Sequence, residues 1–147
     1  MTVPTMDPVV VSVFVKADAE RAFDAFTGEM TSWWPLTEIS ISKPDRVVVE
    51  ARQGGEIYEV NGGLSHHWAW ITAWERPRRI AVEWKVDEDA PVPTAWEATF
   101  TPEGEGTRLT LVHTGWEALG DGAAEARDSY DGGWAGILER YVTYLNG

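Results

Sequence analysis

Residues 94–116 read TAWEATFTPEGEGTRLTLVHTGW, and this stretch decides the fold. Apolar and polar residues alternate on both sides of the EGEG segment at residues 103–106, as they do in strands that bury one face. Glycine and acidic residues readily adopt the backbone angles of a tight turn. The stretch therefore predicts an antiparallel hairpin with strands over residues 94–101 and 107–114.

Further strands of the same kind precede this hairpin. Turn-forming residues separate short runs rich in β-branched and aromatic side chains, which predict strands over residues 9–16, 39–42, 46–51, 56–60, 66–74 and 79–85. Short strands joined by tight turns favour an antiparallel sheet. After the first strand, Asp18 can cap a helix over residues 19–27, and Pro35 ends a second, very short helical stretch.

The end of the chain has a different pattern. From about Asp121 the apolar period changes from two to 3.6 residues, and the resulting stripe consists of Tyr130, Trp134, Ile137, Tyr141 and Leu145. This predicts a helix long enough to lie across the sheet. Gly132, Gly133 and Gly136 cost such a helix about 1 kcal/mol each relative to Ala. We interpret that cost as a sign of close backbone approach or a kink.

A curved antiparallel sheet that grips one long amphipathic helix is the simplest way to bury these faces. The predicted fold is therefore α+β and of the helix-grip type. Its 147 residues suit one domain, over residues 1–147 with an ordered core at about 9–146, and contain no internal repeat or linker.

Charge and composition exclude several classes of partner. Twenty-four acidic against twelve basic residues give a net charge of −12, which repels nucleic-acid phosphates and anionic membranes. The absence of Cys excludes disulfides, thiolate metal sites and a Cys nucleophile. No apolar run approaches the ~20 residues that span a bilayer. We expect a cytoplasmic protein that binds no nucleic acid and inserts into no membrane.

Short motifs stand in a fixed order along this pattern: the helix and Trp33–Trp34, Gly54–Gly55, the run RPRRI at 76–80, the run GTRLTLVHTGW at 106–116, and Gly133–Trp134. Over residues 9–145 they resemble the SRPBCC superfamily of START-like helix-grip domains. Within it, the chain looks like the branch named after the activator of a heat-shock chaperone's ATPase. The resemblance implies a deep cavity between helix and sheet for a hydrophobic or aromatic molecule. Lipid carriers, hormone receptors, polyketide cyclases and chaperone activators share this fold, so it does not fix the function.

Nine Trp in so short a chain supply candidate walls for that cavity. Strand parity turns Trp84, Trp96 and His113 inward, the last beside Leu109 and Leu111. Both faces of the strand at residues 66–74 are apolar, so parity does not decide which face lines the cavity. The predicted ligand-binding residues are Trp34, Trp70, Trp84, Trp96, Leu111, His113, Trp134 and Tyr141. The tryptophans could equally form a packed core, and His113 could be a ligand anchor or a core histidine bonded to a carbonyl.

Other candidate sites are weak. His66 and His67 are adjacent on a strand and point to opposite faces, so they cannot chelate one ion. The acidic run at residues 87–89 lacks the ligand spacing and the glycine of a calcium loop. Glu38 and Glu59 have parities that could turn them inward, but we expect both to be exposed. We predict no metal and no cofactor.

Three functions remain open. The first is a module that binds a small hydrophobic or aromatic ligand as a carrier, a sensor or a stress-related protein, and we favour it over an enzyme. The second is a cyclase- or hydrolase-type enzyme that uses His113, Tyr58 or Tyr141 as acid or base. The third is a chaperone-activating interaction, against which the chain offers no second domain to clamp a large partner. A homodimer is left open.

Overall fold

The computed structural model describes residues 7–34, 46–85 and 92–146. Its described strands form one seven-stranded antiparallel sheet in the order β1-β7-β6-β5-β4-β3-β2. The strands are β1 (Val9–Val15), β2 (Arg46–Val49), β3 (Glu56–Asn61), β4 (Leu64–Glu75), β5 (Arg79–Trp84), β6 (Thr94–Glu103) and β7 (Gly106–Thr114). The helices are α1 (Ala19–Gly28), α2 (Met30–Trp33), the 3-10 helix η1 (Trp116–Gly122) and α4 (Ala123–Asn146).

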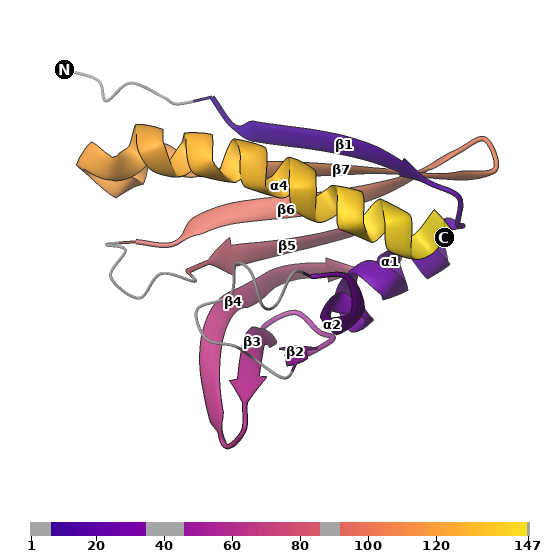
Figure 1. Cartoon of the computed structure of the whole chain (residues 1–147), viewed down its shortest axis with the longest axis horizontal. Helices are drawn as coiled ribbons and strands as arrows, with labels where there is room; N and C mark the ends of the chain where they lie inside the picture. The colour runs from indigo at the N-terminus through magenta and orange to yellow at the C-terminus, as the bar shows by residue number, and fades with distance from the viewer. Residues whose placement is uncertain (1–6, 35–45, 86–91, 147) are drawn as a thin grey trace.

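The helix-grip prediction is confirmed. α4 crosses one face of the sheet beside β1, β7 and β6, and its C-terminal end reaches α1 and α2 (Figure 1). The hairpin of β3 and β4 curves away from this helix layer (Figure 1). α1 begins where predicted, because the Asp18 carboxylate accepts a 2.8 Å hydrogen bond from the backbone N–H of Arg21. The strand predicted at residues 39–42 lies outside the described residues.

The hairpin of β6 and β7 has the predicted register. Trp96 lies opposite His113, and Phe100 lies opposite Leu109. Burial alternates residue by residue from Thr94 to Phe100, with the even-numbered side chains inside. The sequence alone does not predict the segment that follows, where Gly115 adopts φ 91° and directs the chain into η1.

β4 is less regular, and its irregularity settles which tryptophans face the core. The register shifts once against β3 and once against β5. Trp68, Ala69 and Ile71 are buried, whereas Trp70 is 49% exposed. Beyond the second shift, the partly buried Trp74 packs edge-on against Phe23, with 5.0 Å between the ring centroids. A strand that is apolar on both faces thus places Trp68 inside and Trp70 outside.

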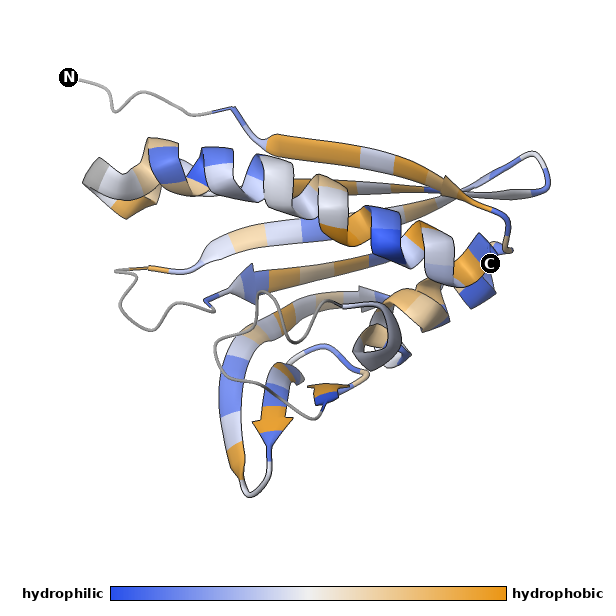
Figure 2. Cartoon of the chain, in the orientation of Figure 1, coloured by the Kyte–Doolittle hydropathy of each residue, from blue (hydrophilic) through white to orange (hydrophobic). Residues whose placement is uncertain are grey.

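α4 is one continuous helix of 24 residues, and its buried side chains are Ala123, Trp134, Ile137, Leu138 and Tyr141. Hydrophobic and hydrophilic residues are interspersed along it (Figure 2). The prediction of close backbone approach at its glycines is wrong. A Cβ added at Gly132, Gly133 or Gly136 would meet no atom within 4 Å. In the described part of the chain, no helix is long and apolar enough to cross a membrane.

Candidate functional site

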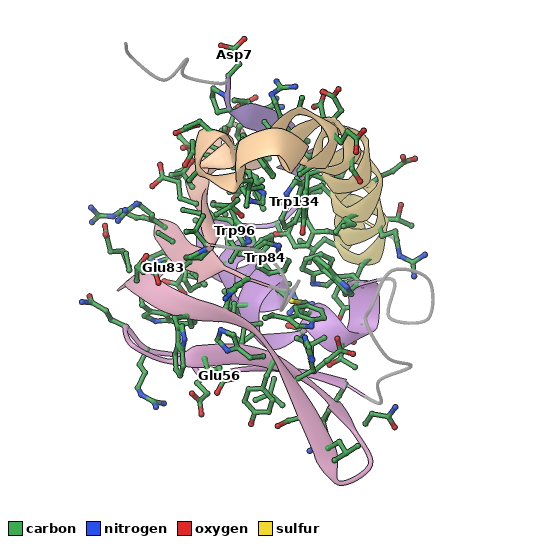
Figure 3. The ribbon with its side chains drawn as sticks, turned by 90° about the vertical axis from the view of Figure 1, so that its left-hand side faces the viewer. Asp7, Glu56, Glu83, Trp84, Trp96 and Trp134 are labelled. Carbon is green, nitrogen blue, oxygen red and sulfur yellow. The ribbon has the colours of Figure 1, made fainter. Side chains whose placement is uncertain are left out.

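Five indole rings gather between α4 and the sheet. They come from the end of α2, from β4, β5 and β6, and from α4, and we call them the aromatic cluster: Trp34, Trp68, Trp84, Trp96 and Trp134. Each is at most 7% exposed. Trp34 packs at a tilt against Trp68 with ring centroids 5.0 Å apart, and Trp96 meets Trp134 edge-on at 5.6 Å. Trp134 descends from the helix toward Trp96 and Trp84 (Figure 3).

His113 on β7 lies beside this cluster and is completely buried. The Trp134 indole N–H donates to His113 Nδ1 at 2.9 Å. Because an indole nitrogen can only donate, Nδ1 must be the unprotonated acceptor and Nε2 must carry the proton. Nε2–H then donates to the Thr94 hydroxyl at 2.7 Å. His113 is therefore a neutral imidazole whose two nitrogens are both occupied.

Burial lowers the pKa of His113 from 6.5 to about 3. An imidazole that stays neutral at physiological pH, with both nitrogens already hydrogen-bonded, is poorly suited to proton transfer. Tyr141, the second predicted acid or base, donates its hydroxyl proton to the Ala22 carbonyl at 2.7 Å. Burial raises the pKa of Tyr141. Both groups hold elements together, Tyr141 by tying α4 to α1.

The indole N–H groups of the cluster fall into two sets. Three have acceptors, since Trp84 donates to the Tyr130 hydroxyl at 3.0 Å, Trp68 to Glu59 at 2.8 Å, and Trp134 to His113. Two do not, because the N–H groups of Trp34 and Trp96 are buried without an acceptor among the described residues. Trp34 and Trp96 both contact the ring of Trp134, at 5.9 and 5.6 Å between centroids. Two unsatisfied donors thus flank one indole.

The carboxyl group of Glu59 also belongs to this interior. Glu59 is 1% exposed, and its Oε1 accepts the hydrogen bond from Trp68. The expectation that Glu59 is exposed is therefore wrong. It shares the inner face of β3 with Ile57, while Glu56 on the outer face bonds to His67 at 2.8 Å. Glu38, expected to be exposed as well, lies outside the described residues.

Seven of the eight predicted ligand-binding residues lie together in the buried interior: Trp34, Trp84, Trp96, Leu111, His113, Trp134 and Tyr141. Their role in ligand binding stays a prediction. Trp70 is the exception and needs correction, because it is exposed and its ring packs against His67 with centroids 4.9 Å apart. A bulge in the pairing of β4 with β3 lets Trp68 and Ala69 both turn inward, which leaves Trp70 on the outside.

Sequence reasoning missed three interior residues: Trp68, Glu59 and Thr94. Trp68 gave no usable signal because both faces of its strand are apolar. Glu59 shares the parity of Ile57, so the pattern allowed an inward position although exposure was expected. Thr94 begins β6 on the same face as Trp96, so parity could have placed it next to the inward His113.

A surface groove of about 440 Å³ lies between α2 and α4. Ser32 and Trp33 form one wall, and Gly136, Glu139 and Arg140 are among the residues of the other. Arg140 spans it by donating to the Trp33 carbonyl at 3.1 Å. Since the Trp33 and Trp34 rings are 6.0 Å apart, the groove lies close to the outer end of the aromatic cluster.

Metal chemistry finds no support in the described residues, where no group of three His, Cys, Asp or Glu side chains could hold an ion. The sequence singled out one pair of adjacent histidines, His66 and His67. Of these two, His67 pairs with Glu56 on the outer face of the sheet. The acidic run at residues 87–89 lies outside the described residues.

The family model of activator of Hsp90 ATPase homologue 1-like proteins matches residues 16–146. The chain belongs to this family. Its resemblance to the SRPBCC superfamily and to the chaperone-activator branch is thereby confirmed. No curated protein sequence matches the chain.

Solved structures of the same fold carry different functions in their descriptions. An anthrahydroquino-γ-pyrone synthase, solved in complex with a ligand, is 30% identical with a TM-score of 0.65, and the match covers 95% of this chain and 97% of that one. The Aha1 dimer from Colwellia psychrerythraea is 16% identical, with a TM-score of 0.69 and coverage of 96% and 97%. An Hsp90 activator from Plasmodium falciparum is 21% identical, with a TM-score of 0.53 and coverage of 74% and 73%. The last two show the fold alone.

Proposed function

We propose that this protein binds a small oxygenated aromatic molecule within the aromatic cluster beneath α4, as a carrier or sensor. The observation that carries the proposal is the pair of buried indole N–H groups, on Trp34 and Trp96, that have no acceptor among the described residues. A buried donor left unsatisfied costs about 1–3 kcal/mol. An oxygen atom of a ligand that accepts from either group recovers part of this cost.

The surroundings of the two donors define the ligand's shape. The neighbouring indole rings favour a flat, apolar body that packs against them; Trp84 and Trp134 are themselves in contact, with ring centroids 6.0 Å apart. A pure hydrocarbon of the same shape would leave both N–H groups unsatisfied. The solved structure that is 30% identical, an anthrahydroquino-γ-pyrone synthase in complex with a ligand, supports an oxygenated ring system as the ligand class.

A matched pair of probes tests the proposal. 1-Tetralone and tetralin share one bicyclic skeleton and differ by a carbonyl oxygen, and their binding is followed by quenching of tryptophan fluorescence and by thermal shift. The wild-type protein is expected to bind 1-tetralone about 5- to 10-fold more tightly than tetralin, the value of one net hydrogen bond. Trp34→Phe and Trp96→Phe keep an aromatic ring but remove the donor, so together they should erase most of this preference.

Trp74→Phe is the matched control, because Trp74 packs on Phe23 outside the cluster. It should leave the affinity ratio of the two probes unchanged. Equal affinity of the wild type for ketone and hydrocarbon, or no binding of either, would contradict the proposal.

Contact with a chaperone is a second candidate, supported by family membership and by two exposed apolar side chains on β4. Leu64 is 78% exposed and Trp70 is 49% exposed. Stoichiometric binding to purified Hsp90 that is weakened by Trp70→Ser would establish this role. Wild-type protein that passes through immobilised Hsp90 unretained would exclude it.

A homodimer stays a prediction, which the description of the related Aha1 structure as a dimer supports. Light scattering after size exclusion measures the mass directly. A particle of about twice the 16.4 kDa chain mass would confirm it, and a particle of the chain mass would refute it.

A further inference from the structure

The face of the sheet that is turned away from α4, here called the outer face, carries a large exposed ring. Trp70 on β4 is 49% exposed, although indole side chains are on average highly buried in proteins. Its ring packs at a tilt against His67, with centroids 4.9 Å apart. This contact holds the indole on the outer face and leaves much of it open to a partner.

Two carboxyl groups flank this ring across the neighbouring strands. Glu56 on β3 and Glu83 on β5 are the cross-strand partners of Trp70, and such partners have their Cβ atoms about 5 Å apart. Glu56 is already paired with His67 at 2.8 Å. Glu83 is exposed, and its carboxyl group bonds to nothing among the described residues, Lys85 just beyond β5 included. Glu83 therefore presents an uncommitted negative charge on the side of the sheet away from α4 (Figure 3).

A hollow of about 290 Å³ lies beside the Trp70–Glu83 pair on this face. Ala95, in its lining, is the cross-strand partner of Glu83, which places the hollow next to the uncommitted carboxylate. Glu97 also lines it, but its charge is balanced by Arg79 at 2.9 Å. Small side chains from β4 to β7 make up much of the lining: Thr72, Ala81, Ala95 and Thr114. The hollow therefore has room for the stem of a long side chain whose end reaches Trp70 and Glu83.

We infer that the outer face of β4, β5 and β6 is a docking surface for an arginine-bearing segment of a partner protein. The stem of the arginine lies in the hollow, its guanidinium group stacks on the indole of Trp70, and its N–H groups donate to the Glu83 carboxylate. Arginine suits this site better than lysine, because its planar group stacks on aromatic rings and donates two parallel hydrogen bonds to a carboxylate.

The charge of the whole chain favours the same kind of partner. A net charge of −12 attracts a basic segment from a distance, and the uncommitted carboxylate of Glu83 then gives that segment a specific contact. The inference does not depend on the ligand proposed for the aromatic cluster, which lies on the other face of the sheet, nor on the partner being a chaperone.

A matched pair of peptides tests the docking surface. Hexa-arginine amide and hexa-lysine amide carry the same charge, and the fluorescence anisotropy of labelled peptides measures their affinities at low ionic strength. The wild-type protein should bind hexa-arginine about 3- to 5-fold more tightly than hexa-lysine, the value of one exposed cation–π contact. Trp70→Leu keeps an apolar side chain but loses the aromatic face, so it should reduce this preference to less than about 2-fold.

NMR of the indole N–H groups places the bound peptide. The signal of Trp70 is identified by its absence from the spectrum of Trp70→Leu. It should shift as hexa-arginine is added, whereas the signal of the buried Trp134 should stay in place. Peptide binding that leaves the Trp70 signal unmoved would show that the arginine docks elsewhere, and the inference would fail.

Glu139→Gln is the matched control for Glu83→Gln, because both remove one exposed negative charge. Glu139 lies on α4, on the opposite side of the sheet. Glu83→Gln should weaken the binding of hexa-arginine by about 2- to 5-fold, the range of an exposed ion pair, and Glu139→Gln should leave it unchanged. Equal losses for the two variants would mean that the peptide senses only the net charge, which would contradict a specific site.

The remaining outcomes separate the partner segment from a second copy of this chain. If light scattering finds a wild-type dimer that Trp70→Leu converts to a monomer, and hexa-arginine does not shift the Trp70 signal, a second copy covers the outer face and the inference is wrong. Equal wild-type affinity for the two peptides would also overturn it. Neither result affects the binding of 1-tetralone, so the proposed function stands or fails separately.

Discussion

The indole nitrogen of Trp134 on α4 donates a 2.9 Å hydrogen bond to Nδ1 of His113 on β7. This contact ties the long helix to the sheet inside the core. It also fixes the tautomer, since Nε2 must then carry the proton that bonds to Thr94. His113 thus spans two elements as a neutral structural group, which is the second of the two roles considered for it, although its partners are side chains and not a carbonyl.

Loss of the Trp134 donor should weaken the fold. Trp134→Phe keeps an aromatic ring but leaves Nδ1 of the fully buried His113 without its partner. The expected loss is about 1–3 kcal/mol in the free energy of unfolding, measured by urea denaturation. Tyr144→Phe removes a hydrogen bond to Glu29 at the surface and should cost less than about 1 kcal/mol. Similar losses for the two variants would argue against a special role of the buried contact.

The protonation of His113 predicts how stability depends on pH. The unfolded chain protonates this imidazole near pH 6.5, whereas burial lowers the pKa in the folded protein to about 3. Between these values the unfolded state binds more protons, so the stabilisation is complete above pH 6.5 and declines as the pH falls toward 3. The expected loss between pH 7 and pH 5 is about 2 kcal/mol, measured by urea denaturation at each pH.

His113→Gln isolates this contribution, because it removes the titrating group while the other ionisable groups remain. The difference in unfolding free energy between pH 7 and pH 5 should shrink by about 2 kcal/mol in the variant. Nitrogen NMR of the wild type at pH 5 should still show a neutral imidazole protonated at Nε2. An imidazolium signal for His113 at that pH would show that the assignment is wrong.

The sequence predicted the fold far better than the site. Alternation along β6 and β7 placed Trp96 and His113 correctly. A strand with one polar and one apolar face can bury only the apolar face, which fixes the side chains that point inward. The same reasoning had no basis at Trp68 and Trp70, where both faces are apolar and the register shifts. It also could not identify the unsatisfied N–H groups of Trp34 and Trp96, since whether a donor finds an acceptor depends on distances between distant segments.

The two faces of β4 should respond differently to substitution. Trp70→Ser on the outer face should change the free energy of unfolding by less than about 0.5 kcal/mol, as surface changes usually do. Trp68→Phe should cost about 2 kcal/mol or more, because it removes part of a fully buried side chain and the N–H that donates to buried Glu59. Chemical denaturation of both variants measures the contrast. A larger loss for Trp70→Ser would mean that the register of β4 is reversed.

The glycines of α4 offer a test in the opposite direction, toward higher stability. A Cβ at Gly132, Gly133 or Gly136 meets open space, so alanine gains the better helix propensity without a clash. Each substitution should stabilise the protein by about 0.5–1 kcal/mol in urea denaturation. Gly106→Ala is the contrast, because its Cβ would lie 2.2 Å from the Val15 carbonyl oxygen, and it should destabilise. If alanine lowered the free energy of unfolding at all three helix positions, the close backbone approach predicted from the sequence would be supported instead.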